Sequence, residues 1–306
     1  MKLRQLDLIG NTPLVHLSHY STDDVQIYAK LEMYNPGGSI KDRLGKHLIE
    51  QALNRGNLLE GGTVVEATAG NTGIGLLMAA IPYHIDCVIF APEGFAEEKM
   101  TTMRALGATI YRTPREEGMM GARQQAQAYA QTHHAFYTNQ FETIDNPKAY
   151  QHTLASEILT DLPDIDCFVA GAGSGGTFSG VAERFVSQAI RCVVVEPRGS
   201  ILSGNEKGRH DTEGIGVETW PTFLKREWID AVEVVSDAKA FQHVKDLARY
   251  EGLLVGSSSG AALEGALQTA KRLEKGNIVV VFPDGSDRYL SKNIFTYGGM
   301  QDKRRY

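Results

Sequence analysis

The segment "CFVAGAGSGGTFSGVAERFV", residues 167–186, indicates the fold class because it combines three successive elements. Its apolar start predicts a buried strand over residues 167–171. The glycines that follow suit a tight turn, and "TFSGVAERFV" has the spacing of an amphipathic helix. A strand that leads through a short turn into a helix is the repeating unit of α/β proteins, whose strands are mainly parallel.

The same alternation continues on both sides of this segment. The other predicted strands cover residues 26–31, 63–66, 87–91, 109–112, 135–138, 192–196, 232–235 and 277–282. Predicted helices include one with apolar residues four apart from Ile40 to Ala52, two at 96–106 and 118–132, and one that Asn146 caps, with Pro147 at its first position, and that ends near Leu159. The strands are almost continuously apolar, which predicts sheets covered by helices on both faces.

No repeat, low-complexity tract or long linker divides the 306 residues, so we expect interleaved domains rather than tethered ones. Residues 35–144 are predicted to form a smaller, mobile α/β domain. Residues 1–34 and 145–306 are predicted to form a larger α/β domain, with 297–306 as a frayed tail. The sheets of both domains are expected to be mainly parallel.

Composition and charge exclude several function classes. With 42% hydrophobic residues, 22% charged residues and a net charge of -6, the chain is typical of a soluble globular protein and not of a basic nucleic-acid binder. The one basic cluster, residues 303–305, lies in a polar tail. The longest apolar run, residues 74–81, is far shorter than the roughly 20 residues that span a membrane. Neither a nucleic-acid nor a membrane partner is expected.

The cysteines indicate neither a disulfide framework nor a metal site. Cys87, Cys167 and Cys192 each begin an apolar run, and no CxxC or HExxH motif occurs. We therefore expect buried free thiols, no metal and a cytoplasmic location.

Four glycine-containing turns follow a predicted strand or open a predicted helix, where ligand sites form at the edge of a sheet. They are NPGGSIKD at 35–42, TAGNTGIG at 68–75, GAGSGGT at 171–177 and GSSSGAA at 256–262. One such turn is weak evidence, since every tight turn favours glycine. Four of them are harder to attribute to chain geometry alone.

The third turn has two interpretations. It contains G-x-G-x-x-G, and Glu196 follows about 20 residues later, which matches the fingerprint of an NAD-dependent oxidoreductase. The same backbone N–H groups, with the hydroxyl of Thr177, would equally bind a single phosphate at a helix N-terminus. The dinucleotide interpretation leaves Lys41 unexplained.

Lys41 stands where a helix is predicted to begin, which is the end of the helix dipole that disfavours a cation. It is either an indifferent surface lysine or an amine kept neutral and nucleophilic for Schiff-base formation. A phosphate-binding turn and an activated lysine together indicate pyridoxal 5'-phosphate, which is both an aldehyde and a phosphate.

The motifs NPGGSIKDR, TAGNTGIG, GAGSGGT, EGIG and GLLVGSSSGAAL together resemble the cysteine synthase/cystathionine β-synthase family of fold-type II pyridoxal-phosphate enzymes. The resemblance extends from IGNTPLV at 9–15 to FPDGSDRYLS at 282–291. It implies two three-layer α/β domains, similar to the tryptophan synthase β fold, with the active site between them and the cofactor phosphate bound by the larger domain.

The resemblance also implies roles for individual residues. Lys41 is the Schiff-base lysine and general base, Asn71 bonds the ring hydroxyl, and Ser258 faces the pyridine nitrogen. The implied phosphate-binding residues are Gly173, Ser174, Gly175, Gly176 and Thr177. The implied substrate-binding residues are Thr68, Ala69, Gly70, Asn71, Thr72, Gln140, Glu213, Gly214, Ile215 and Gly216, of which the last four line the mouth of the site.

The implied reaction is β-replacement through an aminoacrylate intermediate, to which a thiol adds. Family members that use sulfide and make cysteine typically carry TSGNTG and QGIG, whereas this chain has Ala69 and Glu213. We therefore expect O-acetylserine, or serine, and homocysteine as substrates, with Glu213 accepting a hydrogen bond from the homocysteine ammonium. This pattern is most similar to the bacterial O-acetylserine-dependent type. In the alternative, a cysteine synthase, Glu213 is a solvated carboxylate.

The expected partners are small-molecule amino acids and thiols. The resemblance further implies a homodimer, and an association with serine acetyltransferase remains open.

Overall fold

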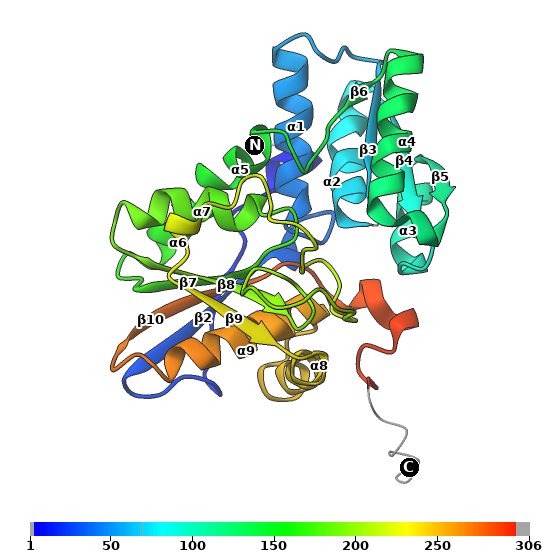
Figure 1. Cartoon of the computed structure of the whole chain (residues 1–306). Coiled ribbons are helices and arrows are strands. Elements are labelled where there is room, and N and C mark those ends of the chain that lie inside the picture. The colour runs from blue at the N-terminus through cyan, green and yellow to red at the C-terminus, as the bar shows by residue number, and fades with distance from the viewer. Residues whose placement is uncertain (1–2, 69, 298–306) are drawn as a thin grey trace.

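The computed structural model describes residues 3–68 and 70–297 and contains two sheets (Figure 1). The larger sheet has six strands in the order β1-β2-β10-β7-β8-β9. These strands are β1 (Leu14–His16), β2 (Val25–Leu31), β7 (Cys167–Gly171), β8 (Arg191–Pro197), β9 (Ala231–Val235) and β10 (Gly276–Phe282). β1 runs antiparallel to β2, and the other neighbouring pairs are parallel.

The smaller sheet has four parallel strands in the order β5-β4-β3-β6. Its strands are β3 (Thr63–Ala67), β4 (Asp86–Pro92), β5 (Thr109–Thr113) and β6 (Phe136–Tyr137). Two mainly parallel sheets interleaved with helices confirm the predicted α/β class.

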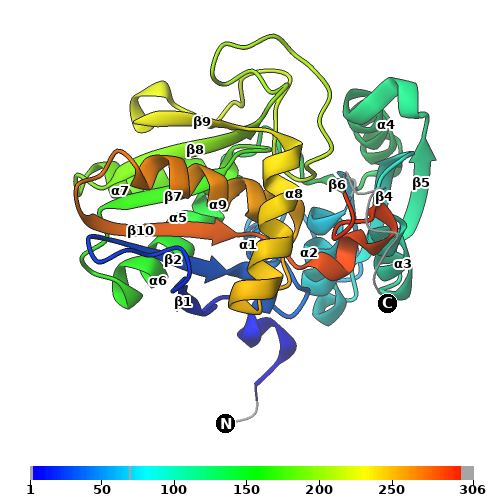
Figure 2. The same cartoon turned by 90° about the horizontal axis from the view of Figure 1, so that it is seen from below.

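Helices cover both faces of each sheet (Figures 1 and 2). On the larger sheet, α5, α6 and α7 lie on one face, and α8 and α9 lie on the other. On the smaller sheet, α4 lies on the face opposite to α2 and α3. The helices are α1 (Lys41–Asn54), α2 (Asn71–Ala80), α3 (Glu97–Ala105), α4 (Gly118–His133), α5 (Asp145–Gln151), α6 (Leu154–Asp161), α7 (Gly176–Val186), α8 (Asp237–Asp246) and α9 (Ser257–Ala270).

All the predicted strands occur, and no strand end differs from its predicted position by more than one residue. The short antiparallel β1 was not predicted. The predicted helix from Asn146 to Leu159 is wrong. Asn146 and Pro147 lie inside α5, and the chain leaves the helical conformation at Thr153, with φ -111° and ψ -83°. The Thr153 hydroxyl donates to the carbonyl of Ala149, so a side chain takes an acceptor that a continuous helix would use.

One hydrophobic cluster runs from one sheet to the other. It contains Val64 and Ile89 of the smaller sheet, Leu44 of α1, and Phe168 and Val194 of the larger sheet. A second cluster lies between the larger sheet and the helices α8 and α9. The boundaries of two domains at 35–144 and at 1–34 plus 145–306 remain a prediction.

Cys87, Cys167 and Cys192 are buried free thiols in β4, β7 and β8, as expected. Within residues 3–68 and 70–297, no group of acidic, histidine and cysteine side chains is arranged to hold a metal ion. In the same part of the chain, no helix combines the length and apolar character needed to cross a membrane. The basic residues 303–305 and the rest of the predicted tail beyond Tyr297 lie outside the described residues.

Candidate active site

Asp284, which follows β10, joins three of the four glycine-containing turns. Its buried carboxylate accepts hydrogen bonds from Asn71 Nδ2 at 2.6 Å and from the Tyr289 hydroxyl at 2.5 Å. Its backbone carbonyl accepts from the N–H of Gly256 at 3.0 Å, and its backbone forms an isolated bridge with Ser39. The turns that precede α1, α2 and α9 therefore meet beyond the carboxyl end of β10, where open α/β sheets place their ligand sites.

Lys41 is the first residue of α1, as predicted. Its side chain is half-buried, and its ammonium group has no hydrogen-bond or ion-pair partner among the described residues. Burial lowers the pKa of Lys41 from 10.5 to about 8, although the charge of Glu66 raises it. A lysine with this pKa holds a substantial fraction of neutral, nucleophilic amine close to neutral pH.

Glu66 links the end of β3 to the segment that carries Gln140. Its buried carboxylate accepts from the N–H of Ala67 at 2.7 Å, from the N–H of Gln140 at 3.0 Å and from the Thr138 hydroxyl. Burial raises the pKa of Glu66 to about 7, although these hydrogen bonds lower it. Gln140 Oε1 in turn accepts from the hydroxyl of Thr72 at 2.8 Å. The structure thus brings together Gln140 and the first turn of α2.

The rest of the turn before α2 is closely surrounded by protein. The N–H of Gly70 donates to Thr68 Oγ1 at 3.2 Å, and both residues are buried. Asn71 Oδ1 accepts from Arg288 at 2.8 Å while its Nδ2 donates to Asp284, so both ends of this amide have protein partners. Ala69, a predicted substrate-binding residue, lies outside the described residues.

The turn from Gly173 to Thr177 presents free backbone donors at the start of α7. Gly175 precedes the helix with φ +83°, a left-handed conformation that glycine adopts readily. Within residues 3–68 and 70–297, no acceptor meets the N–H groups of Gly173, Ser174, Gly175 and Thr177. Unpaired N–H groups at a helix N-terminus form a ready anion site.

Asn146 connects this turn to Gln140. Its Nδ2 donates to the Gln140 carbonyl at 2.6 Å and to Ser174 Oγ at 3.1 Å, and its side chain is buried. A Cβ on Gly176 would collide with the Asn146 amide, so glycine is required for this contact. The sequence had suggested only a capping role for Asn146, which the structure does not show.

The mouth segment 214–216 lies directly against the same turn. A Cβ on Gly173 would come within 2.6 Å of the Gly214 carbonyl oxygen, and the N–H of Gly216 donates to the Ala172 carbonyl at 2.8 Å. Ile215 is buried between the mouth and the larger sheet. The mouth residues named from the sequence are therefore neighbours of the predicted phosphate-binding turn.

Glu213 contacts the start of α9, the helix that carries Ser258. Ser258 is buried in the first turn of this helix, and its neighbour Ser257 accepts the N–H of Glu213 at 3.1 Å. The Glu213 carboxylate lies 2.9 Å from the ammonium of Lys99 in α3, and its side chain is 18% exposed. It is therefore not the solvated carboxylate of the alternative interpretation.

Sequence reasoning missed several of these residues. Asp284 and Glu66 carried a signal, since each is an acidic residue at or just after the end of an apolar strand. Lys99 carried none and Asn146 only that of a helix cap, because Glu213 and Ser174, their partners in the site, are distant in the sequence.

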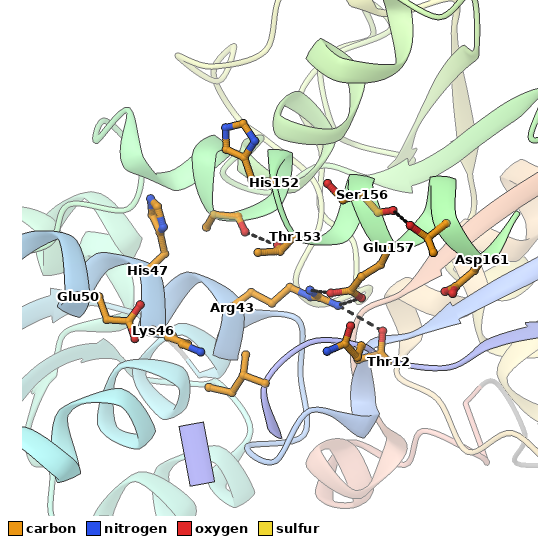
Figure 3. A pocket seen from close by; sticks show the side chains of 14 residues that line it. Thr12, Arg43, Lys46, His47, Glu50, His152, Thr153, Ser156, Glu157 and Asp161 are labelled. Carbon is orange, nitrogen blue, oxygen red and sulfur yellow. Dashed lines mark hydrogen bonds and ion pairs between the residues drawn. The ribbon is translucent and has the colours of Figure 1, made fainter. Parts of the chain in front are cut away.

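A separate cleft of about 640 Å³ lies between α1, α5 and α6 (Figure 3). Arg43, Lys46, His47 and Glu50 line it, and Arg43 points towards Glu157. At 3.6 residues per turn these four positions lie on the side of α1 opposite to Lys41. The cleft therefore belongs to the opposite face of this helix and not to the cluster around Asp284.

Comparison with known proteins identifies the family. A family model described as "Pyridoxal-phosphate dependent enzyme" matches residues 5–284. The chain belongs to this family. It is 50% identical over 298 residues to the O-acetylserine dependent cystathionine beta-synthase of Bacillus subtilis, covering 95% of this chain and 97% of that protein. It is 47% identical over 298 residues to a cysteine synthase of Helicobacter pylori, covering 94% and 97%.

Solved structures agree with these sequence relationships. The crystal structure of O-acetylserine dependent cystathionine beta-synthase from Helicobacter pylori has a TM-score of 0.92 and 46% sequence identity, covering 96% of this chain and 99% of that chain. The cysteine synthase from Entamoeba histolytica has a TM-score of 0.92 at 32% identity, covering 98% and 92%. The predicted fold type is confirmed.

The residues present suit pyridoxal phosphate, which supplies an aldehyde and an electron-accepting ring when bound. The free N–H groups of Gly173, Ser174, Gly175 and Thr177 match a phosphate, and the amine of Lys41 has no competing partner among the described residues. The dinucleotide interpretation is wrong for this family member. Its acidic residue, Glu196, accepts the N–H groups of Leu202 at 2.7 Å and Ser203 at 2.8 Å and so stabilises a local turn.

Proposed function

We propose that the protein catalyses pyridoxal-phosphate-dependent β-replacement on O-acetylserine, or serine, with homocysteine as the thiol and cystathionine as the product. The observation that carries β-replacement is the half-buried Lys41, with a pKa of about 8, at the junction of the three turns that meet at Asp284. The 50% identity to an O-acetylserine dependent cystathionine beta-synthase supports the choice of substrates.

In this proposal Lys41 carries the cofactor and later moves a proton at Cα as general base. Residues 173–177, where the free backbone donors of α7 lie, would hold the phosphate. Ser258 would face the pyridine nitrogen, and Asn71 would bond the ring hydroxyl after giving up one of its present partners. The carboxylate of the first substrate binds at residues 68–72 and at Gln140. The Thr72 hydroxyl at the start of α2 and the Gln140 amide, which contact each other, are suitable groups for this carboxylate.

The proposed thiol rests on Glu213. An acidic side chain at the mouth accepts a hydrogen bond from an ammonium group, which homocysteine has and sulfide lacks. Cysteine synthase activity with sulfide is the second candidate. The 47% identity to a cysteine synthase favours it, as does the cation that already neutralises Glu213 in this structure.

Product analysis tests the proposal. The purified holoenzyme would receive O-acetylserine, or serine, with homocysteine and sulfide in separate and in competing reactions, and mass spectrometry would quantify the products. We expect cystathionine to form with the higher kcat/KM. Cysteine as the favoured product would contradict the assigned thiol, and the absence of both products would contradict β-replacement.

The variant Glu213→Gln tests the residue that carries the thiol assignment. It should lower kcat/KM for homocysteine more than for sulfide, because the amide keeps the size of the side chain but lacks its charge. Equal losses with the two thiols would contradict this role. Domain closure on substrate binding, a homodimer, an association with serine acetyltransferase and a cytoplasmic location remain predictions.

A further inference from the structure

Lys99 and Glu213 form a partly buried ion pair that no sequence motif predicted. The distance from Lys99 Nζ to Glu213 Oε2 is 2.9 Å, and the two side chains are 6% and 18% exposed. Lys99 comes from α3, whereas Glu213 directly precedes the mouth segment 214–216, so the pair bridges segments that are distant in the sequence. A charge pair this sheltered from water is costly to separate unless each member receives a new partner.

The surroundings place this pair beside the predicted substrate turn. The aliphatic stem of Lys99 occupies the space that a Cβ on Gly70 would fill, and its ammonium lies 4.1 Å from the ring centroid of Tyr289. On the other side, the N–H of Glu213 donates to Ser257, next to Ser258. The pair therefore lies between the turn before α2 and the start of α9, beside residues that the proposed function assigns to the first substrate.

We propose that Lys99 and Glu213 together select the second substrate by its zwitterionic end. In this inference, which rests on the proposed function, Lys99 binds the α-carboxylate of the incoming amino-acid thiol and Glu213 binds its α-ammonium group. When the substrate binds, the ion pair separates and each side chain pairs with a substrate group of opposite charge instead. No buried charge is therefore left without a partner. Sulfide carries no such pair of charges and gains nothing from the exchange.

Four thiols separate the two halves of this recognition. Homocysteine carries both groups, 3-aminopropane-1-thiol carries only the ammonium, 4-mercaptobutanoate carries only the carboxylate, and sulfide carries neither. The holoenzyme and the variants Lys99→Met and Glu213→Gln would be assayed with each thiol at saturating O-acetylserine. Lys99→Arg, which keeps the charge, tests rescue. Lys207→Met is the matched control, since Lys207 forms an exposed ion pair with Glu218 at 2.7 Å.

Lys99→Met should lower kcat/KM by about 10- to 100-fold for the two thiols that carry a carboxylate, which is the worth of one charge-assisted hydrogen bond. It should change kcat/KM for 3-aminopropane-1-thiol and sulfide by less than about threefold, a small effect on this scale. Glu213→Gln should give the complementary pattern, with the losses confined to the thiols that carry an ammonium. Lys99→Arg should retain most of the selectivity, and Lys207→Met should behave as the wild type.

A uniform loss over all four thiols in Lys99→Met would overturn the inference, since a purely structural bridge does not distinguish among substrates. Unchanged use of homocysteine by Lys99→Met would overturn it as well. If Lys99→Met fails to fold, the test rests on Glu213→Gln alone: losses confined to the thiols that carry an ammonium support the inference, and equal losses over all four thiols overturn it. The proposed function fails separately, when the wild type makes no cystathionine. A wild type that makes cystathionine but whose variants lose all thiols equally contradicts only the selection by Lys99 and Glu213.

Discussion

At the scale of single residues, burial brings the pKa values of Lys41 and Glu66 close to one another. Burial lowers the pKa of Lys41 to about 8 and raises that of Glu66 to about 7. Both shifts favour the neutral form, and the negative charge of Glu66 counteracts part of the shift at Lys41. The helix N-terminus, where Lys41 begins α1, acts in the same direction as burial.

This predicts how the apoprotein captures its cofactor as pH changes. The rate of covalent capture of pyridoxal phosphate should rise as pH increases through about 8 and then level off, because the neutral amine of Lys41 is the nucleophile. Glu66→Gln should move the midpoint to lower pH, since it removes the charge that raises the pKa of Lys41. Borohydride fixation of the cofactor, followed by mass spectrometry, measures the rate of capture in the wild type and in Glu66→Gln at each pH.

Lys46→Ala is the control for this measurement, because Lys46 lies on the opposite side of α1 and its ammonium contacts the Leu6 carbonyl. Its profile should match that of the wild type. A midpoint close to 10.5, the ordinary pKa of lysine, would contradict the effect of burial on Lys41.

At the scale of elements, two glycines set how closely α1 and α2 approach. A Cβ on Gly45 would collide with the backbone of Gly75, and a Cβ on Gly75 would collide with the Lys41 carbonyl. The contact therefore holds the first residue of α1 against the middle of α2. Both glycines are buried inside helices, where their conformations are ordinary, so the requirement comes from the approach of two backbones and not from strain.

Gly75→Ala should destabilise the protein by about 1–3 kcal/mol, the cost of overpacking a tight contact. In an uncrowded helix the same change stabilises by about 0.5–1 kcal/mol, so the sign of the effect reports the contact. Urea unfolding followed by circular dichroism measures the free energy of unfolding. A higher free energy of unfolding in Gly75→Ala would contradict the prediction, because it would mean that α1 and α2 move apart with no loss of stability.

At the scale of the whole molecule, a buried ionic network ties the segment before β1 to β2, α1 and α6. Arg43 donates to Glu32 at 2.7 Å and to Glu157 at 2.6 Å. Lys30 lies 3.1 Å from Glu157 and donates to the Thr12 carbonyl at 2.7 Å. Figure 3 shows the Arg43 side chain pointing towards Glu157. The residue two positions after Lys41 therefore anchors the start of α1 to the larger sheet and to α6.

The network predicts a dependence of stability on pH. Burial alone would raise the pKa of Glu157, but the hydrogen bond and charge of Arg43 outweigh it and lower the pKa from 4.5 to about 2. The resulting stability is fully present above pH 4.5 and is lost as pH falls through about 2. Glu157→Gln should therefore lower the free energy of unfolding by about 3 kcal/mol at neutral pH. The free energy of unfolding of this variant should also change less with pH across this range.

Thermal unfolding at a series of pH values between neutrality and acid measures this profile. Glu142→Gln is the control, because the Glu142 side chain is 58% exposed in its ion pair with Arg123. It should unfold almost as the wild type does. Parallel profiles for Glu157→Gln and the wild type would contradict the assigned pKa.

Local features of the sequence predicted most of the fold. Apolar runs and their flanking glycines located the strands and the four turns, because periodicity and turn conformation depend on residues close together in the chain. The break at Thr153 was missed, since a hydroxyl bond to the carbonyl of Ala149 competes with the helix without altering the apolar pattern. The short β1 was missed because its three residues have too little periodicity to detect.

The candidate site divides in the same way. Local sequence patterns were enough to predict that Lys41 begins a helix and that residues 173–177 present backbone donors at the start of another helix, because both follow from local chain conformation. Three features became visible only in the folded protein: Asp284 joins three turns, Asn146 connects Gln140 to Ser174, and Lys99 neutralises Glu213. Asn71–Asp284, Asn146–Ser174 and Lys99–Glu213 join segments separated by whole strands and helices. Such contacts form only when the chain crosses between the two sheets, and no local pattern encodes that crossing.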